Sequence, residues 1–445
     1  MKGPAAIRPA PPGVEDLLRV HDAFPERYPH LLVSGKDAGW GFDILFASPR
    51  DPLVLHAGAS RSQCARFFSA LDACSGVARA SEAPDTALPF LFGHFLYLSY
   101  ELVGAFESRV TLTGPADVPL AWLQGFDGAI IKDWRSGAVT VTGRDTTVVE
   151  GIEEDLRRMP DPRPWPSVTV EHVEHDPPEA YRDGVRDIHD YILAGDIFQA
   201  NLSRSYRGRL ASKTRAAALF DSLRRHNPAP FSAIARLGET LIASASPERL
   251  LRCRGRVIMT QPIAGTRARL SDMVEDEGAQ RDLRADPKER AEHLMLVDLE
   301  RNDLGRVCVA GSIRVSHLMR IESYATVHHL VSDIEGTLRA EVTLSDVIRA
   351  LFPGGSITGC PKIRCVEILG LSEHGSRGAY TGSLGYINER GDTDLNILIR
   401  TLVVRGREIG FRVGAGIVAD SDPMRELRET EAKAAGLLRA LGCGT

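Results

Sequence analysis

Apolar residues at helical spacing mark one segment of the chain as an amphipathic helix. Between residues 178 and 193 the apolar side chains recur every three to four positions, at Tyr181, Val185, Ile188 and Ile192. These positions share one face of a helix, and a glycine, typical of a helix end, follows the segment. The pattern therefore predicts a helix over 178–193.

Two Asp-Pro pairs predict two more helix starts. Asp286 and Asp422 can each cap a helix N-terminus, and the proline that follows each is favoured at the first helical position. We expect helices to run from these points to about residues 300 and 440.

Short β-rich runs separated by turns fill the first third of the chain, which is typical of an antiparallel sheet. These runs span residues 30–34, 42–47, 129–132 and 138–142. Farther along, helices and strands mix. The strands predicted there span residues 240–244, 256–260, 395–404 and 409–413.

A proline-rich stretch at 159–166 and an acidic run at 171–179 interrupt this pattern. Both compositions are typical of a linker. We therefore expect an N-terminal subdomain at 1–155, a linker at 156–177 and a second domain at 178–445.

The charge balance limits the kinds of partner. The 445 residues carry 54 Lys and Arg against 59 Asp and Glu, a formal net charge of −5. A protein that mainly binds nucleic acid or an anionic membrane needs a dense basic surface, so neither is expected as a partner. Small molecules and other proteins remain as the expected kinds of partner.

The seven cysteines are scattered and include no C-x-x-C motif. This favours reduced thiols in a cytoplasmic protein over a disulfide framework or a zinc site. The N-terminus lacks the apolar segment of a secretory signal. The most apolar stretch, 89–106, is interrupted by polar residues, which favours buried core over a membrane span.

Two of the predicted helices begin with the same pair of acids three residues apart. The pairs are Glu289 with Glu292 and Glu426 with Glu429. This spacing puts both acids of a pair on one face, where oxygen ligands suit a hard cation such as Mg²⁺. The alternative is that acids near a helix N-terminus only complement the helix dipole.

Two glycine-rich runs could bind an anion through backbone amides. The run FPGGSITGCPK at 352–362 leads into a helix, and Gly414-Ala415-Gly416 follows a predicted strand. Neither matches a P-loop or a dinucleotide fingerprint, so ATP and NAD binding are not supported. Plain tight turns remain the alternative for both.

Single polar residues in apolar surroundings are further candidates for ligand-binding or catalytic residues. Arg400 lies within the predicted strand 395–404, where a charged side chain needs an anionic partner. The pair His328-His329 also lies in an apolar segment, where a histidine is more often a satisfied core residue than a catalyst. No G-x-S-x-G elbow and no glycine-flanked cysteine is present, so a serine hydrolase or a built-in glutaminase is not predicted.

Many longer motifs occur in an order that resembles one family, the chorismate-utilising enzymes. The resemblance covers about residues 178–436, with a weaker match at 31–49. Within the family the chain is most similar to component I of aminodeoxychorismate synthase and of anthranilate synthase. The motifs are GDIFQANLSR (195–204), SASPERL (244–250), PIAGTRAR (262–269), DPKERAEHLMLVDLERNDLGRV (286–307), TVHHLVS (326–332), FPGGSITGCPKIR (352–364), GAYTGSLGY (378–386), LNILIRT (395–401) and VGAGIVADSDPMRELRET (413–430).

This resemblance implies an α+β fold of large antiparallel β-sheets flanked by helices, with 178–445 as the chorismate-binding catalytic domain. It assigns the four acids to a Mg²⁺ site that anchors the ring carboxylate of chorismate. It also implies a set of substrate-binding residues. That set is Gly414, Ala415 and Gly416 at the ring carboxylate, Tyr380 and Arg400 at the enolpyruvyl carboxylate, and Ser356, Thr358, Asn201 and Thr266 around the substrate.

The resemblance implies amination of chorismate, in which an amine displaces the ring hydroxyl. Hydroxide leaves only when protonated, so a general acid is required. By resemblance Glu248 is this acid and His329 lies beside the departing group. Water-adding relatives carry a lysine where this chain has Gln199, a poor base, which favours ammonia over water.

The product is either aminodeoxychorismate, for folate and 4-aminobenzoate synthesis, or anthranilate. Asn201 and the string GSITG resemble the first group. Ala264 replaces the lysine that many of that group use as a nucleophile, and anthranilate synthases also have alanine there. Lys362 is retained as a further catalytic candidate.

Ammonia is expected from a separate glutamine amidotransferase, in a heterodimer. The alternative from another functional class is a non-catalytic regulatory subunit that binds carboxylates.

Overall fold

The computed structural model describes residues 5–34, 41–74, 86–114, 118–212, 214–324 and 327–443. Parts of two sequence motifs, residues 35–40 and Thr326, lie outside the described residues. Every strand pairing within these ranges is antiparallel, and the strands join into one continuous hydrogen-bonded system of 21 strands. The predicted α+β class, with large antiparallel sheets flanked by helices, is confirmed.

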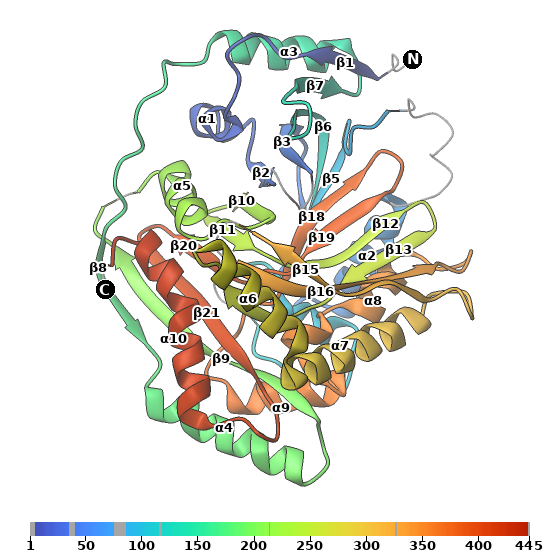
Figure 1. The fold of residues 1–445 in the computed structure, drawn as a ribbon. Helices are drawn as coiled ribbons and strands as arrows, with labels where there is room; N and C mark the ends of the chain where they lie inside the picture. Colours follow the sequence, from blue (N-terminus) through green and yellow to red (C-terminus); the bar gives the residue numbers. More distant parts are fainter. Residues whose placement is uncertain are drawn as a thin grey trace.

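Most N-terminal strands lie in the upper part of the molecule in Figure 1, whereas the last of them, β8, lies lower at the left. They are β1 (Ala6–Pro9), β2 (His30–Val33), β3 (Phe42–Pro49), β4 (Leu53–Leu55), β5 (Gly93–Leu98), β6 (Ala121–Asp133), β7 (Val139–Gly143) and β8 (Val170–His175).

The remaining strands include β9 and β21, a long antiparallel pair whose members lie far apart in the sequence. They are β9 (Gln199–Leu210), β10 (Phe231–Leu237), β11 (Thr240–Ser246), β12 (Arg249–Arg254), β13 (Val257–Gln261), β14 (Ile263–Ala268), β15 (Arg314–Ser323), β16 (Val327–Thr337), β17 (Gly359–Cys360), β18 (Ser383–Asn388), β19 (Thr393–Asn396), β20 (Thr401–Arg405) and β21 (Glu408–Ile417).

Helices cover the faces of these strands. α10 packs along β21 beside α4, while α7 packs on β14 and β16 (Figure 1). The helices are α1 (Leu17–Ala23), α2 (Arg61–Cys74), α3 (Thr146–Arg157), α4 (Pro178–Leu193), α5 (Ala216–His226), α6 (Met273–Ala285), α7 (Pro287–Gly305), α8 (Leu344–Leu351), α9 (Lys362–Ser372) and α10 (Pro423–Ala440), with 3₁₀ turns η2 (Tyr100–Ala105) and η3 (Gly355–Ile357).

The three predicted helices are confirmed. α4 covers the predicted residues, and its apolar stripe packs against β9. The carboxylates of Asp286 and Asp422 cap α7 and α10 by accepting backbone N–H groups of the first turn, as their Asp-Pro pairs predicted. α7 extends about one turn beyond the predicted end, because its last turn is buried by apolar contacts that the local sequence does not signal.

Two predictions on the C-terminal strands are wrong. The strand predicted at 395–404 is broken into β19 and β20, and Arg400 lies in the break with a positive φ of 51°. Gly414, Ala415 and Gly416 belong to β21 and not to a turn after it. Glycine is tolerated inside this strand because neighbouring groups leave no room for a Cβ atom.

The N-terminal and C-terminal segments share strand pairs and a hydrophobic core. β2 pairs with β10, and β5 pairs with β18. Aromatic residues of β3, β5 and β6 pack in one cluster with Ala233 of β10 and Leu384 of β18. Residues 170–175, expected to be linker, form β8, because their backbone pairs with β9. The subdomain boundaries stay a prediction.

Cys64, Cys253, Cys308, Cys360, Cys365 and Cys443 are free thiols in the structure. In the part of the chain that the structure describes, no helix is both long and apolar enough to cross a bilayer.

Candidate active site

The centre of the candidate site is one face of the paired strands β9 and β21. Gly416 lies opposite Asn201, and Gly414 lies opposite Ser203. A Cβ atom on Gly414 would stand 2.7 Å from the Tyr380 hydroxyl, and one on Gly416 would stand 2.4 Å from the Gln199 amide nitrogen. The glycines therefore let two polar side chains approach the strand backbone.

Neighbouring residues of these strands divide between the site and the core. The Asn201 amide donates to the Tyr380 hydroxyl at 3.4 Å, so these two predicted residues lie together. The side chain of Ala415 points to the other face, into the core with α4, because side chains alternate along a strand. Only the backbone of Ala415 borders the site.

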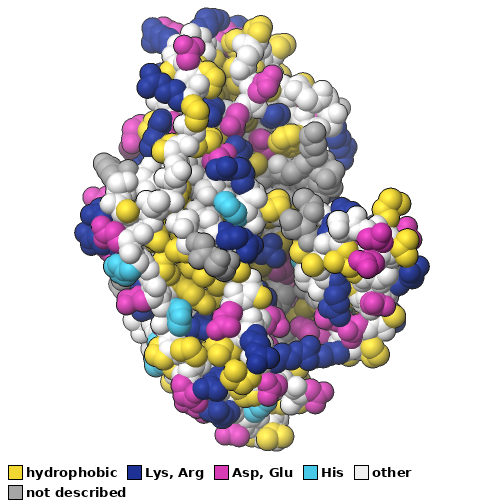
Figure 2. Space-filling model, turned by 60° about the vertical axis from the view of Figure 1, so that its left-hand side comes forward, with side chains coloured by type: hydrophobic (Ala, Val, Ile, Leu, Met, Phe, Trp, Pro, Cys, Tyr) yellow, Lys and Arg dark blue, Asp and Glu magenta, His cyan; other side chains and the backbone are white. Residues whose placement is uncertain are grey.

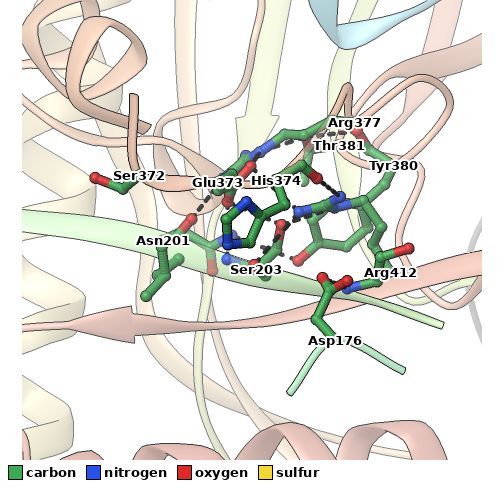
Figure 3. Close-up of polar contacts among 12 residues, drawn as sticks. Asp176, Asn201, Ser203, Ser372, Glu373, His374, Arg377, Tyr380, Thr381 and Arg412 are labelled. Atoms are coloured by element: carbon green, nitrogen blue, oxygen red, sulfur yellow. Dashed lines mark hydrogen bonds and ion pairs between the residues drawn. The ribbon is translucent and has the colours of Figure 1, made fainter. Parts of the chain in front are cut away.

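A buried charged network holds Tyr380 and Asn201 in place (Figure 3). Glu373 accepts two hydrogen bonds from the Arg377 guanidinium at 2.7 Å, and Arg412 lies 3.7 Å from the same carboxylate. Arg377 also donates to the backbone carbonyls of Ile357 and Asn201. We call Arg377, Glu373 and Arg412 the arginine network.

The arginine network keeps its carboxylate ionised. Burial alone would raise the pKa of Glu373, but the charges of Arg377 and Arg412 and a hydrogen bond from Ser203 hold it below its ordinary value. Sequence reasoning missed these residues because they lie between the recognised motifs.

Glu248, the predicted general acid, lies between β11 and β12 and accepts a hydrogen bond from the Ser356 hydroxyl at 2.6 Å. Burial raises the pKa of Glu248 to about 7, although hydrogen bonds from Ser356 and the Ile263 backbone and the charge of Lys433 lower it. Such a carboxyl group can hold a proton at neutral pH and release it.

Two predicted residues of the 352–362 run are used inside the protein. The Thr358 hydroxyl donates to the Gly354 carbonyl at 2.7 Å and so closes the 3₁₀ turn that carries Ser356. The Lys362 ammonium is buried, 2.6 Å from Asp303, and donates to two carbonyls at the end of α8. Lys362 is thus held away from the β9–β21 face.

His329 and Thr266 face each other across β16 and β14. The His329 Nδ1 atom lies 2.9 Å from the Thr266 hydroxyl, and its Nε2 atom is buried without a hydrogen-bond partner. Burial lowers the pKa of His329 to about 4, and the charge of Arg400 lowers it further. The imidazole is therefore neutral at pH 7. Ala264 lies on the same strand as Thr266 and is buried.

Arg400 lies near His329 with its guanidinium free of protein partners. No hydrogen bond or ion pair to this group occurs among the described residues, and burial lowers its pKa. Its backbone is fixed, because the Arg400 carbonyl accepts the Ala245 N–H at 3.1 Å. A guanidinium that lacks a partner in a partly buried place is suited to a ligand carboxylate.

The four predicted acids of α7 and α10 approach one another beside Gly416. A Cβ atom on Gly416 would lie 3.7 Å from a Glu292 carboxylate oxygen. Burial raises the pKa of Glu292, and repulsion from Glu289 and Glu429 raises it further. Burial also raises the pKa of Glu426, with a contribution from Glu429. We call these four residues the acidic quartet.

Basic side chains hold two of the four acids. Arg267 lies 3.1 Å from Glu289, and Lys433 lies 2.8 Å from Glu429 while also donating to the Gly414 carbonyl. Lys433 was missed as a site residue. Its position four residues after Glu429, on the same helix face, was the available signal.

The acidic quartet fits a divalent cation in its chemistry. Its oxygen donors are those that Mg²⁺ prefers, and the repulsion that raises the pKa of Glu292 is of the kind that a cation relieves. Within the described ranges, however, no three acidic, histidine or cysteine side chains already stand as a metal site. Arg267 and Lys433 occupy part of the carboxylate positions that a cation would need.

A cavity of about 340 Å³ is lined by Tyr380, Arg377, Arg412 and residues of β20 and β21. It includes neither Glu248 nor the acidic quartet, so of these predicted groups it reaches Tyr380 but not the proposed acid or metal ligands.

Acidic and basic side chains are interspersed over the face that carries α5 and α10 (Figure 2). No continuous basic area is visible among the described residues on this face.

Known proteins resemble the chain over most of its length. A family model for chorismate binding enzymes matches residues 29–439. Aminodeoxychorismate synthase component 1 of Bacillus subtilis is 43% identical over 378 residues, which cover 81% of this chain and 78% of that protein. An anthranilate synthase component I-like protein of Synechocystis is 39% identical over 378 residues, covering 84% and 78%.

The fold has the same relatives. The crystal structure of anthranilate synthase component I from Streptococcus pneumoniae superposes with a TM-score of 0.77 at 27% identity, covering 88% of this chain and 91% of that one. Fold and site together define a chorismate-utilising enzyme. The chain belongs to the chorismate binding enzyme family, as its motifs indicated.

Proposed function

We propose that the chain is component I of aminodeoxychorismate synthase. It would replace the ring hydroxyl of chorismate by an amino group, giving 4-amino-4-deoxychorismate for 4-aminobenzoate and folate synthesis. The observation that carries this proposal is the buried Glu248, whose pKa of about 7 suits a proton donor to the departing hydroxyl.

Glu248 supplies the proton that hydroxide needs to leave as water. The Ser356 hydroxyl fixes the orientation of the carboxyl group. His329, neutral at pH 7 and with Nε2 free of a partner, can form a hydrogen bond to the departing group. The hydrogen bond between Thr266 and Nδ1 orients its ring.

The two carboxylates of chorismate are bound by different groups. Arg400 and Tyr380 are suited to the enolpyruvyl carboxylate, and the Gly414–Gly416 backbone to the ring carboxylate. Glu289, Glu292, Glu426 and Glu429 would hold Mg²⁺. When bound, this cation supplies charge neutralisation and positioning of the substrate.

Gln199 favours ammonia over water as the nucleophile. Its amide oxygen is buried without a hydrogen-bond partner, so it can accept an N–H of ammonia. A neutral amide cannot deprotonate water. Because relatives are named component 1, we propose a separate glutamine amidotransferase as the source of ammonia.

Anthranilate synthase component I is the second candidate, and Ala264 is the residue that favours it. No lysine is available at this position for a covalent adduct, and relatives carry both names. In either case ammonia attacks the ring directly. Anthranilate formation requires the further loss of pyruvate.

Product analysis separates these candidates. The purified chain is incubated with chorismate, Mg²⁺ and ammonium, and the products are separated by chromatography. We expect 4-amino-4-deoxychorismate; fluorescent anthranilate without an added lyase would instead identify the second candidate. No Mg²⁺-dependent consumption of chorismate, in a folded chain, would indicate the non-catalytic carboxylate-binding subunit.

Ala264→Lys tests the neighbourhood of the missing lysine. A covalent adduct in this variant, seen by mass spectrometry, would show that the pocket accepts the lysine mechanism. Turnover without an adduct supports direct amination.

A further inference from the structure

Four ionisable side chains lie buried around the 3₁₀ turn Gly355–Ile357. Glu300 and Asp303 come from α7, Lys362 from the start of α9 and Glu248 from the β11–β12 connection. Each is less than 9% exposed. Only one of the four carries a positive charge.

The positive charge of Lys362 is already fully used. Its ammonium lies 2.6 Å from Asp303 and donates to the carbonyls of Ala350 and Leu351 at 3.3 and 3.1 Å. An ammonium has three donors, and three partners are present. Asp303 is therefore the one carboxylate that this cation neutralises.

Glu300 and Glu248 approach the same turn from different elements. A Glu300 carboxylate oxygen lies 4.0 Å from the position of a Cβ atom on Gly355. Gly355 permits α7 to pack closely on this turn, since a Cβ atom there would come 2.5 Å from the Leu299 side chain. The next residue, Ser356, donates its hydroxyl to Glu248.

Within the described ranges neither of these two acids forms an ion pair, since Lys362 is paired with Asp303. A buried carboxylate without a cation is costly, so the neutral acid is favoured. The pKa of Glu300 is raised to about 8, mainly by burial and also by the charges of Asp303 and Glu248, against the lowering effects of Lys362 and the Thr260 hydroxyl. Ionisation of one acid thus disfavours ionisation of the other.

Few other charged groups face the pair. The charge of Lys433 on α10 lowers the pKa of Glu248. The thiol of Cys360 lies near Asp303, and its pKa is raised mainly by burial and also by that carboxylate.

We propose that Glu300 and Glu248 form a coupled pair of buried acids that holds at most one negative charge near neutral pH, so that Glu300 acts as a positioning residue for proton donation by Glu248. This inference rests on the proposed role of Glu248. It also gives Lys362 a function: with Asp303 it forms the neutral pair that leaves Glu300 protonated. When Glu248 is deprotonated, Glu300 keeps its proton. When Glu300 is deprotonated, the negative charge helps Glu248 to keep its own.

Infrared spectroscopy of the substrate-free chain tests the pairing without turnover. Protonated carboxylic acids have a carbonyl-stretch band distinct from carboxylates and amides. We expect this band in the wild-type protein near pH 6, and we expect it to shrink as the pH rises to about 9 and the buried acids ionise, Glu248 and Glu300 among them. The difference between wild type and Glu300→Gln should show the loss of one acid from the band and a changed titration of Glu248. A band that is unchanged in Glu300→Gln from pH 6 to 9 overturns the proposal.

Asp303→Asn provides an independent variant if Glu300→Gln does not fold. It frees the Lys362 ammonium, which then favours a carboxylate at Glu300. The Glu300 component of the band should therefore be lost at lower pH than in the wild type. A Glu300 component that titrates as in the wild type contradicts the proposed charge balance.

The pH dependence of turnover tests the effect on Glu248. In the wild type, molecules that ionise at Glu300 retain the proton on Glu248, so kcat should fall slowly at alkaline pH. Glu300→Gln removes the molecules in which Glu300 is ionised and Glu248 is protonated. The kcat of this variant should therefore be similar to that of the wild type at pH 6.5 but lower by about threefold or more at pH 9.

Glu389→Gln is the matched control, because Glu389 is also a buried acid with a raised pKa, but it lies in the β18–β19 connection. Its pH profile should follow that of the wild type. A uniform loss of kcat in Glu300→Gln at every pH would indicate a merely structural role and contradict the proposal. If the chain consumes no chorismate, the proposed function fails while the infrared result still decides the pairing.

Discussion

The arginine network and the acidic quartet border the same strand, yet their charges are balanced in opposite ways. Arg412 of β21 belongs to the network, and four residues later Gly416 borders Glu292 of the quartet. In the network every charged group has hydrogen-bonded partners inside the protein. In the quartet, like charges repel and only surface cations compensate them. The first arrangement fixes the site, and the second is suited to an added positive charge.

The largest expected effect is the loss of stability when the network loses its carboxylate. Glu373→Gln leaves Arg377 and Arg412 buried without an anion, which should cost about 3–5 kcal/mol of the free energy of unfolding. Urea denaturation measures the change. Glu154→Gln, which removes an exposed pair with Arg158, should change it by less than about 1 kcal/mol. Equal effects of the two variants would show that the network is not a structural anchor.

Loss of a quartet acid should lower activity without lowering stability. Glu292→Gln should lower the Mg²⁺-dependent rate of chorismate consumption by about a hundredfold or more, since a cation site contributes several kcal/mol to catalysis. Without Mg²⁺ the variant should be at least as stable as the wild type, because one repelling charge is removed.

Glu431→Gln is the control for this variant, because Glu431 is exposed on the same helix as Glu429 and Glu426. It should retain full activity. Wild-type rates in Glu292→Gln would contradict a role of the quartet in turnover.

Arg400 lies outside both regions and has no counter-ion among the described residues, so its loss should chiefly weaken substrate binding. Arg400→Ala removes a charge-assisted hydrogen bond worth about 1.5–3 kcal/mol, so kcat/KM should drop by about tenfold or more. Steady-state kinetics with chorismate measures this. Arg405→Ala removes an arginine whose partner is the exposed Glu239, and it should leave kcat/KM near the wild-type value. Unchanged kinetics in Arg400→Ala would refute its assignment.

The features that could be predicted from the sequence are those set by local patterns, namely helix caps, the apolar faces of helices and the family motifs. Asp286 and Asp422 cap their helices through contacts within one turn, so the sequence suffices to place them. Arg400 was assigned to a strand because its neighbours are apolar. The break there depends on backbone bonds to β11 and to the turn before β18, which are distant in sequence.

The arginine network shows a further limit of sequence reasoning. Glu373 and Arg377 are four residues apart and could be read as a surface helix pair. Their burial follows only from β9 and β21 closing over them. Likewise, the burial of Lys362 against Asp303 depends on the packing of α9 near α7 and α8, which no local pattern reports.

The smallest expected effect is the opposite pH dependence of stability in the two regions without Mg²⁺. The pKa of Glu373 is lowered in the folded state, so its contribution is present above the unfolded pKa and is lost as the pH falls through the folded one. The pKa of Glu292 is raised, so its contribution is present below the unfolded value and is lost as the pH rises through the folded one. Glu292→Gln should therefore gain stability relative to the wild type as the pH rises above the ordinary carboxyl pKa, and the gain should be small because solvent screens a partly exposed acid. Glu373→Gln should lose stability relative to the wild type as the pH rises toward the ordinary carboxyl pKa from below, and the difference should stay constant above it. Urea midpoints measured at several pH values check both slopes, and slopes of the same sign would show that the two regions do not differ in charge balance.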